Sequence, residues 1–109
     1  MANNSIIAWP DAERLVNATS FTGSSLNIGS TLTVNPVNMV FDNTSDVTVS
    51  IFIDGIQWKT FVAGECLVLD CRGNSGQSEN FTFPLGSQFS TNASAGTTGF
   101  FSIAILYAR

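Results

Sequence analysis

The 109-residue chain has no histidine and little charge: four basic and eight acidic side chains make up 11% of it, against roughly 25% in an ordinary soluble domain. Without histidine, the chain lacks the usual general base for a serine or cysteine nucleophile and the commonest zinc ligand. The four cations, Arg14, Lys59, Arg72 and Arg109, are scattered, whereas nucleic acids and membrane surfaces are bound by cations gathered on one face. No apolar run approaches the roughly 18 residues of a membrane-spanning helix. We therefore expect neither a nucleic acid nor a membrane as partner.

Cysteine is also scarce, and its two positions do not suit a disulfide. Cys66 and Cys71 stand at the two ends of a strand-like run. Extended residues five apart lie on opposite faces and about 16 Å apart, whereas a disulfide needs Cα atoms within about 7 Å. We expect two reduced cysteines, buried in the core rather than bound to metal, as suits a reducing compartment. Residues 1–5 lack the basic and apolar segments of a signal peptide, which favours a protein made in the cytoplasm.

Uncharged polar residues take the place of charge. Asn, Ser and Thr number 10, 13 and 11, while 44% of the chain is hydrophobic and nine residues are Phe. This hydrophobic content is too high for a disordered chain, and the length fits one domain. Charged residues are depleted at the cores of interfaces because removing an ion from water is costly. The composition therefore favours a surface that is largely covered by other subunits.

Alternation of apolar and polar residues predicts β-strands from Leu26 onward. Asp54-Gly55, between two alternating runs, is a strong signal for a two-residue hairpin. Residues 72–79 and 92–99 are predicted to be polar loops. The last strand is apolar on both faces, so we expect it to be central and covered on each side. The predicted strands are residues 31–34, 37–42, 47–53, 56–62, 66–71, 87–91 and 100–107.

This spacing of strands and turns is typical of a sandwich or jelly roll. We therefore expect an all-β fold: a single antiparallel β-sandwich or jelly roll of about seven to eight strands over residues 26–109. Residues 1–25 are expected to form an N-terminal arm or a short helix. Pro10, Asp11 and Glu13 suit the first turn of a helix. The alternative is an extended arm that docks on another subunit.

The carboxylates form no recognisable active site. Most of the eight lie at predicted turns, where aspartate is expected because its side chain bonds the local backbone. Asp42-Asn43-Thr44-Ser45-Asp46 offers oxygens to a cation, but it lacks the glycine and distal glutamate of an EF-hand loop. We therefore predict no enzyme, no cofactor and no metal site, and we leave open whether Asp42 and Asp46 bind a cation.

The aromatic residues are the remaining candidates for binding. Trp58 lies on the return strand of the predicted hairpin, and Trp9 lies in the arm. Exposed aromatics on a β-sandwich can stack on sugar rings, so a carbohydrate-binding module for host attachment is a second hypothesis. We favour a core position for Trp58 and an arm held on a neighbour by Trp9, since aromatics are enriched at protein interfaces. The candidate interface residues are Ile6, Ile7, Trp9 and Trp58.

Several segments together resemble a family of small virion proteins of tailed bacteriophages. The resemblance rests on an N-T-x-x-V-x-V-S-x-D-G-like hairpin, an A-G-E turn, an L-D strand and a closing I-x-I-x-Y strand. These segments are residues 41–55, 61–65, 68–70, 84–89 and 103–109. The similarity covers roughly residues 37–109 and consists of structural residues rather than a functional motif.

The resemblance implies a β-sandwich building block of the capsid decoration, neck or tail. With the composition, it leads us to expect a capsid decoration or cement protein of the virion, made in the host bacterial cytoplasm. Its partners would be copies of itself and other virion proteins such as a capsid, neck or tail protein. A neck or tail protein is the nearest alternative, and a glycan-binding module is the alternative from another class.

Overall fold

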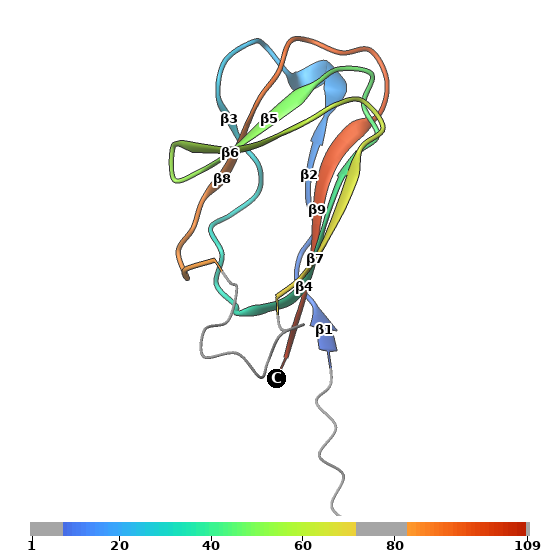
Figure 1. Ribbon diagram of the computed structural model, residues 1–109. Coiled ribbons are helices and arrows are strands. Elements are labelled where there is room, and N and C mark those ends of the chain that lie inside the picture. Colours follow the sequence, from blue (N-terminus) through green and yellow to red (C-terminus); the bar gives the residue numbers. More distant parts are fainter. Residues whose placement is uncertain (1–7, 72–82, 109) are drawn as a thin grey trace, which may run out of the picture.

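The chain forms an antiparallel β-sandwich, shown in Figure 1 as a computed structural model that describes residues 8–71 and 83–108. The strands are β1 (Ala8–Pro10), β2 (Arg14–Asn17), β3 (Leu26–Asn27), β4 (Pro36–Asn43), β5 (Val49–Ile53), β6 (Ile56–Phe61), β7 (Cys66–Asp70), β8 (Phe89–Asn92) and β9 (Phe100–Ala108). One 3-10 turn, Ala18–Ser20, follows β2. No helix in these residues is long and apolar enough to cross a membrane.

The strand order is that of a jelly roll. One sheet has the order β1-β9-β4-β7, with β2 also paired to β9, and the other has the order β3-β8-β5-β6. Because β1 and β2 pair with successive parts of β9, they act as one interrupted strand. Counted so, the described residues form eight strands in two four-stranded layers, as in a jelly roll. The all-β prediction is confirmed.

Most of the predicted strands are present, and the hairpin signal was correct. Ile53 pairs with Ile56 across Asp54 and Gly55, which have φ values of 51° and 83°. Two consecutive positive φ values define the turn type that Asp-Gly favours. The segment 31–34, by contrast, is a loop and not a strand. Its alternation has another cause: Leu32 is buried, and its backbone bonds residues 86 and 87.

The predicted N-terminal helix is wrong for the residues described. Arg14–Asn17 form β2, whose register with β9 runs from Arg14 opposite Ile103 to Asn17 opposite Phe100. The described part of the expected arm is thus paired within its own chain, because an extended segment here completes the sheet beside β9. Ile6, Ile7 and the loop 72–79 lie outside the described residues.

Phenylalanine fills the space between the two layers. The Phe41 ring lies 6.0 Å from that of Phe61, and Phe61 lies 5.2 Å from Phe101 in an edge-to-face arrangement. Each fully buried aromatic contributes roughly 1.5–3 kcal/mol of hydrophobic stabilisation. The largest buried side chains include Phe21, Phe41, Phe61, Phe89 and Phe101. The high phenylalanine content therefore serves the core.

Candidate interaction surface

The sheet that contains β9 has one face in the core and one face directed outward. The register aligns Ala104 of β9 with Val40 of β4, and Val40 with Val68 of β7. Because side chains alternate along a strand, the intervening residues Ile105 and Met39 point into the core, where both are buried. Apolar side chains from three strands therefore form one row on the outer face.

This outer face is apolar and uncovered in the described chain. Val68 is 63% exposed and Leu106 is 39% exposed, and Leu15, in the outward row with Ser102, is 42% exposed. β9 lies inside its sheet, as expected, between β4 and the β1–β2 pair. The described residues cover its inner face but not its outer face, so they do not provide the expected cover on both sides. We call this set of outward side chains on β2, β9, β4 and β7 the outer face.

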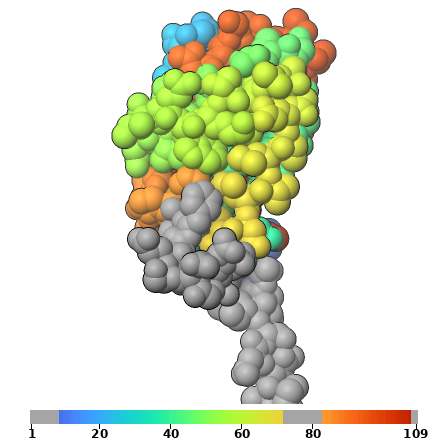
Figure 2. Space-filling model, in the orientation of Figure 1, coloured from blue at the N-terminus to red at the C-terminus, as the bar shows by residue number. Residues whose placement is uncertain are grey.

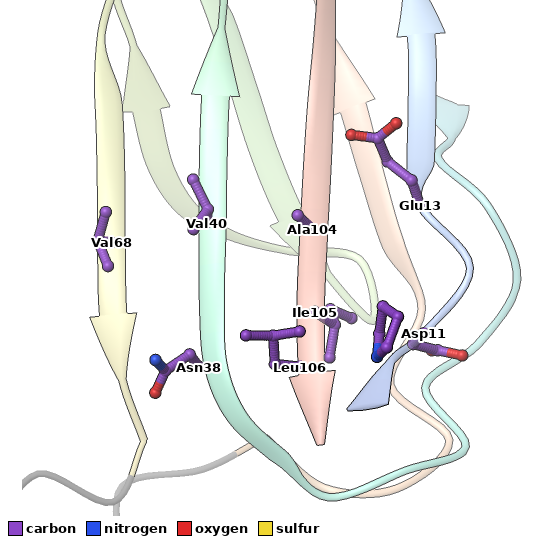
Figure 3. A pocket seen from close by; sticks show the side chains of 9 residues that line it. Asp11, Glu13, Asn38, Val40, Val68, Ala104, Ile105 and Leu106 are labelled. Carbon is purple, nitrogen blue, oxygen red and sulfur yellow. The ribbon is translucent and has the colours of Figure 1, made fainter. Parts of the chain in front are cut away.

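A shallow groove of about 350 Å³ crosses the outer face. In Figure 3, Val68, Val40 and Ala104 lie at one level on neighbouring strands, with Leu106 and Asn38 below them. The groove is lined by Pro10, Asp11, Glu13, Asn38, Val40, Val68, Ala104, Ile105 and Leu106. Its floor offers apolar contact area and few polar groups to fix a small ligand.

Among the described residues, the charged side chains around the outer face are acidic. Asp11 and Glu13 line one end of the groove, and the register places Asp42 and Asp70 in the outward rows of β4 and β7. Neither cation of the described residues lies on this face. Arg14 is 3% exposed and points into the sandwich, and Lys59 pairs with Glu65 at 2.8 Å. In the described part of the chain the outer face thus has an apolar centre and acidic side chains at its margin, of which Asp11 pairs with Arg14 at 3.2 Å.

Of the four predicted interface residues, the structure describes Trp9 and Trp58 and places them in different sheets. Trp9, the middle residue of β1, lies opposite Tyr107 and is 39% exposed, whereas Trp58 lies on β6 in the other sheet. Sequence reasoning missed Val40, Val68 and Leu106. The available signal was the apolar character of β7 and β9 on both faces.

Trp58 packs on the core, as we favoured from the sequence. Its ring centroid lies 5.0 Å from that of Phe41 and 5.5 Å from that of Phe83, the latter edge-on. A second hollow of about 290 Å³ lies beside it, lined by Ile53, Asp54, Ile56, Gln57, Trp58 and Pro84. The two aromatic neighbours thus hold the indole against the core, and the half-buried ring also borders the second hollow.

The two cysteines are unpaired and differ in environment. Cys71 is buried, and burial followed by the nearby charge of Asp70 raises the pKa of its thiol. Cys66 is exposed on β7, so the expectation of a core position is wrong for this residue. The reason is the register, because Cys66 shares its outward row with Asp42.

The segment Asp42–Asp46 does not bring its two carboxylates together around one point. Asp42 points outward from β4, whereas Asp46 accepts hydrogen bonds from the Thr97 amide at 3.0 Å and the Thr97 hydroxyl at 2.6 Å. These bonds, led by that of the hydroxyl, lower the pKa of the Asp46 carboxyl. Asp46 therefore fixes the loop before β9. Within the residues described, no cluster of three or more His, Cys, Asp or Glu side chains is placed to hold a metal ion.

Buried polar side chains in the described part of the chain have structural partners. The Asn43 amide nitrogen donates to the carbonyls of Val47, Phe61 and Val62 at 3.0–3.1 Å. Each buried polar side-chain atom that is described has a hydrogen-bond partner. These groups thus hold turns and loops in place, and they leave the outer face as the candidate site.

Comparison with known proteins adds no family to this picture. No protein-family model matches the chain, and a search of curated proteins likewise gave no match.

Proposed function

We propose that this chain is a non-enzymatic structural protein of a bacteriophage particle, most specifically a capsid decoration or cement protein. It assembles with copies of itself and with another virion protein. The observation that carries the proposal is the apolar outer face that the described residues leave uncovered, with Val40, Val68, Ala104 and Leu106 side by side on three strands.

Burial of this face provides the driving force for assembly. Each Å² of apolar surface removed from water contributes about 25 cal/mol, and side chains such as Val68 and Leu106 gain this energy only when another molecule covers them. Contiguous exposed apolar surface with a polar margin is typical of a protein-binding site. The outer face can be covered by a different surface of another copy or by a second virion protein. Neither arrangement brings the acidic margins of two outer faces together.

The jelly-roll strand order is compatible with the proposal and does not decide it. This architecture recurs in viral capsid domains and in lectins, and a fold by itself does not fix function. A capsid position rests on the resemblance of residues 37–109 to small virion proteins, and a neck or tail position rests on the same residues. Carbohydrate binding through Trp58 is less favoured, since Phe41 and Phe83 pack against its ring.

The proposed location is the virion, after synthesis in the host bacterial cytoplasm. Two unpaired cysteines, one of them exposed on β7, suit a protein that folds where thiols stay reduced.

The outer face is tested by placing a charge at its centre. We expect Leu106→Asp to weaken self-assembly of the full chain at least about tenfold, because the interface would have to bury an unpaired carboxylate. Val62→Asp is the matched control, since Val62 is 58% exposed and lies in the turn before β7, away from the groove. Sedimentation velocity over a range of protein concentrations gives the mass. Equal effects of the two variants would show that the outer face is not an assembly surface.

A further inference from the structure

The edges of the two sheets differ in how well they are protected against pairing with another chain. An edge strand presents a row of backbone donors and acceptors, and proteins protect such edges by short strands, proline, bulges or inward-pointing charges. In the described chain the edge strands are β7 and the β1–β2 pair in one sheet, and β3 and β6 in the other.

Three of these edges carry such a device. β3 has two residues, and the β1–β2 edge is interrupted between Pro10 and Arg14. β6 has a break in register opposite Ile51 and Phe52. Lys59 on β6 lies opposite the buried Ile51, and its ammonium nitrogen lies 4.8 Å from the Phe61 ring centroid, so a charge points inward along this edge.

β7 carries none of these devices. Its five residues, Cys-Leu-Val-Leu-Asp, include no proline and no cation, and the register with β4 is unbroken from Asn38 opposite Asp70 to Asp42 opposite Cys66. Figure 2 shows the yellow segment that contains β7 at the surface, beside the green segment that contains β6. β7 is therefore a regular edge, and its one charged residue, Asp70, stands at its end.

The hydrogen bonds at the two ends of β7 show which backbone groups point outward. The Asn43 amide donates to the Glu65 carbonyl at 2.9 Å, and the Cys71 amide donates to the Val37 carbonyl at 2.8 Å. Hydrogen-bonded pairs alternate along an antiparallel ladder, so Leu67 and Leu69 bond β4. The N–H and C=O groups of the alternate residues, Cys66 and Val68, point away from β4.

We infer that β7 pairs antiparallel with β7 of a second copy, about a two-fold axis at Val68. This inference rests on the proposed function and deepens it by naming the second copy as the partner at this edge. The register with its axis at Val68 sets Val68 opposite Val68, and Leu67 opposite Leu69, of the other copy. Val68 then exchanges both backbone hydrogen bonds with its symmetry mate, and the sheet continues from one copy to the other.

Charge favours the edge over the face as the contact between two copies. In the antiparallel pair Asp70 lies opposite Cys66 of the other copy, so the two Asp70 carboxylates stand at opposite ends of the paired strands. Stacking two outer faces would instead bring carboxylate margins toward each other. The edge pair also joins two outer faces into one larger apolar surface, which another virion protein can cover.

Amide hydrogen exchange of the wild-type full chain tests the pairing residue by residue. In the paired state the amides of Cys66 and Val68 should exchange as slowly as those of Leu67 and Leu69, which bond β4 within the chain. On dilution to the monomer the first two should become fast while the other two stay slow. Fast exchange at Cys66 and Val68 in the assembled protein, or slow exchange that persists in the monomer, would overturn the inference.

A variant pair at Val68 tests the same contact by mass. Val68→Pro removes an outward N–H and leaves the bonds from Leu67 and Leu69 to β4 in place, as edge strands tolerate. We expect it to raise the dimer dissociation constant about 30-fold, the equivalent of two backbone hydrogen bonds. Val68→Thr keeps the N–H and the strand preference, and it should change the constant by less than about threefold. Equal masses for the two variants would contradict the pairing.

The outcomes separate this inference from the proposed function. If Val68→Pro fails to fold, as circular dichroism would show, the exchange of the wild-type amides alone decides. The amides of Cys66 and Val68 could exchange fast in an assembly that Leu106→Asp weakens. In that case the edge pairing is wrong, and the proposal that the outer face is an assembly surface is retained. A wild-type chain that is monomeric at every concentration overturns both.

Discussion

Arg14→Met is expected to destabilise the fold, because buried Arg14 joins three segments: β2, residues 11–12 and the loop at residues 30–31. The side chain is 3% exposed. Its Nε donates to the Ser30 carbonyl at 3.2 Å, and one terminal nitrogen donates to the Thr31 carbonyl at 3.3 Å. The other terminal nitrogen donates to the Ala12 carbonyl at 3.1 Å and to Asp11 Oδ2 at 3.2 Å. The guanidinium thus holds β2 to the loop that leads towards β4.

The structure sets the size of the effect. Methionine keeps most of the aliphatic stem but leaves three carbonyls and a carboxylate without their donor. Hydrogen bonds to a charged group contribute about 1.5–3 kcal/mol each, and these are long ones. Two effects reduce the loss. Water can solvate the Asp11 carboxylate, which is 21% exposed, and the variant no longer bears the free-energy cost of removing a guanidinium from water. The net loss should be about 3 kcal/mol, which corresponds to a fall in Tm of about 12 °C.

Urea unfolding followed by tryptophan fluorescence measures this loss, at one fixed protein concentration because assembly shifts apparent stability. Arg14→Lys should lose about 1–2 kcal/mol, since a single ammonium cannot reach four acceptors. Glu13→Gln, at the exposed neighbouring position, should change the free energy of unfolding by less than about 0.5 kcal/mol. A loss below about 1 kcal/mol for Arg14→Met would refute the view that this guanidinium holds the three segments together.

Two further predictions concern titratable side chains. Thr97→Val should raise the pKa of Asp46 towards its ordinary value, because the hydroxyl is the strongest of the donors that lower it. A carboxyl with a lowered pKa stabilises the fold above the unfolded-state pKa of about 4, and this stabilisation is lost as pH falls through the folded-state value. The variant should therefore be less stable than wild type at neutral pH and equally stable in strong acid. NMR titration of the Asp46 carboxyl and unfolding at both pH values measure this, and an unchanged Asp46 titration would contradict it. Cys66 should react with a maleimide in the native protein while Cys71 reacts only after denaturation, since burial both hides its thiol and raises its pKa; two thiols of equal native reactivity would contradict the burial of Cys71.

Local sequence signals predicted the local structure. The turn at Asp54 and Gly55 follows from the φ preferences of those two residues, and the register of β5 with β6 follows from the turn. The loop around Leu32 was misread because a buried loop residue between polar neighbours produces the same alternation as a strand. The hydrophobic pattern indicates which residues are buried. It does not indicate which hydrogen bonds the backbone makes, and these bonds distinguish a strand from a loop that is held by one buried side chain.

Long-range pairing explains the other differences. β2 is a strand because it pairs with β9, far along the chain, and one of its two buried side chains is Arg14, which no apolar pattern predicts. The outer face likewise depends on register between distant strands, which alone brings Val40 beside Val68. Low charge and a two-sided apolar last strand predicted that some surface is covered. They could not say which surface, because that requires the order of strands in the sheet.

The mass of the wild-type chain in solution tests the central claim most directly, namely that this jelly roll is an assembly subunit. Sedimentation velocity should show a dimer that forms as β7 edges pair and, at higher concentration, heavier species in which outer faces are covered, in place of the 11.6 kDa chain. A single 11.6 kDa species from micromolar to millimolar concentration would contradict the account.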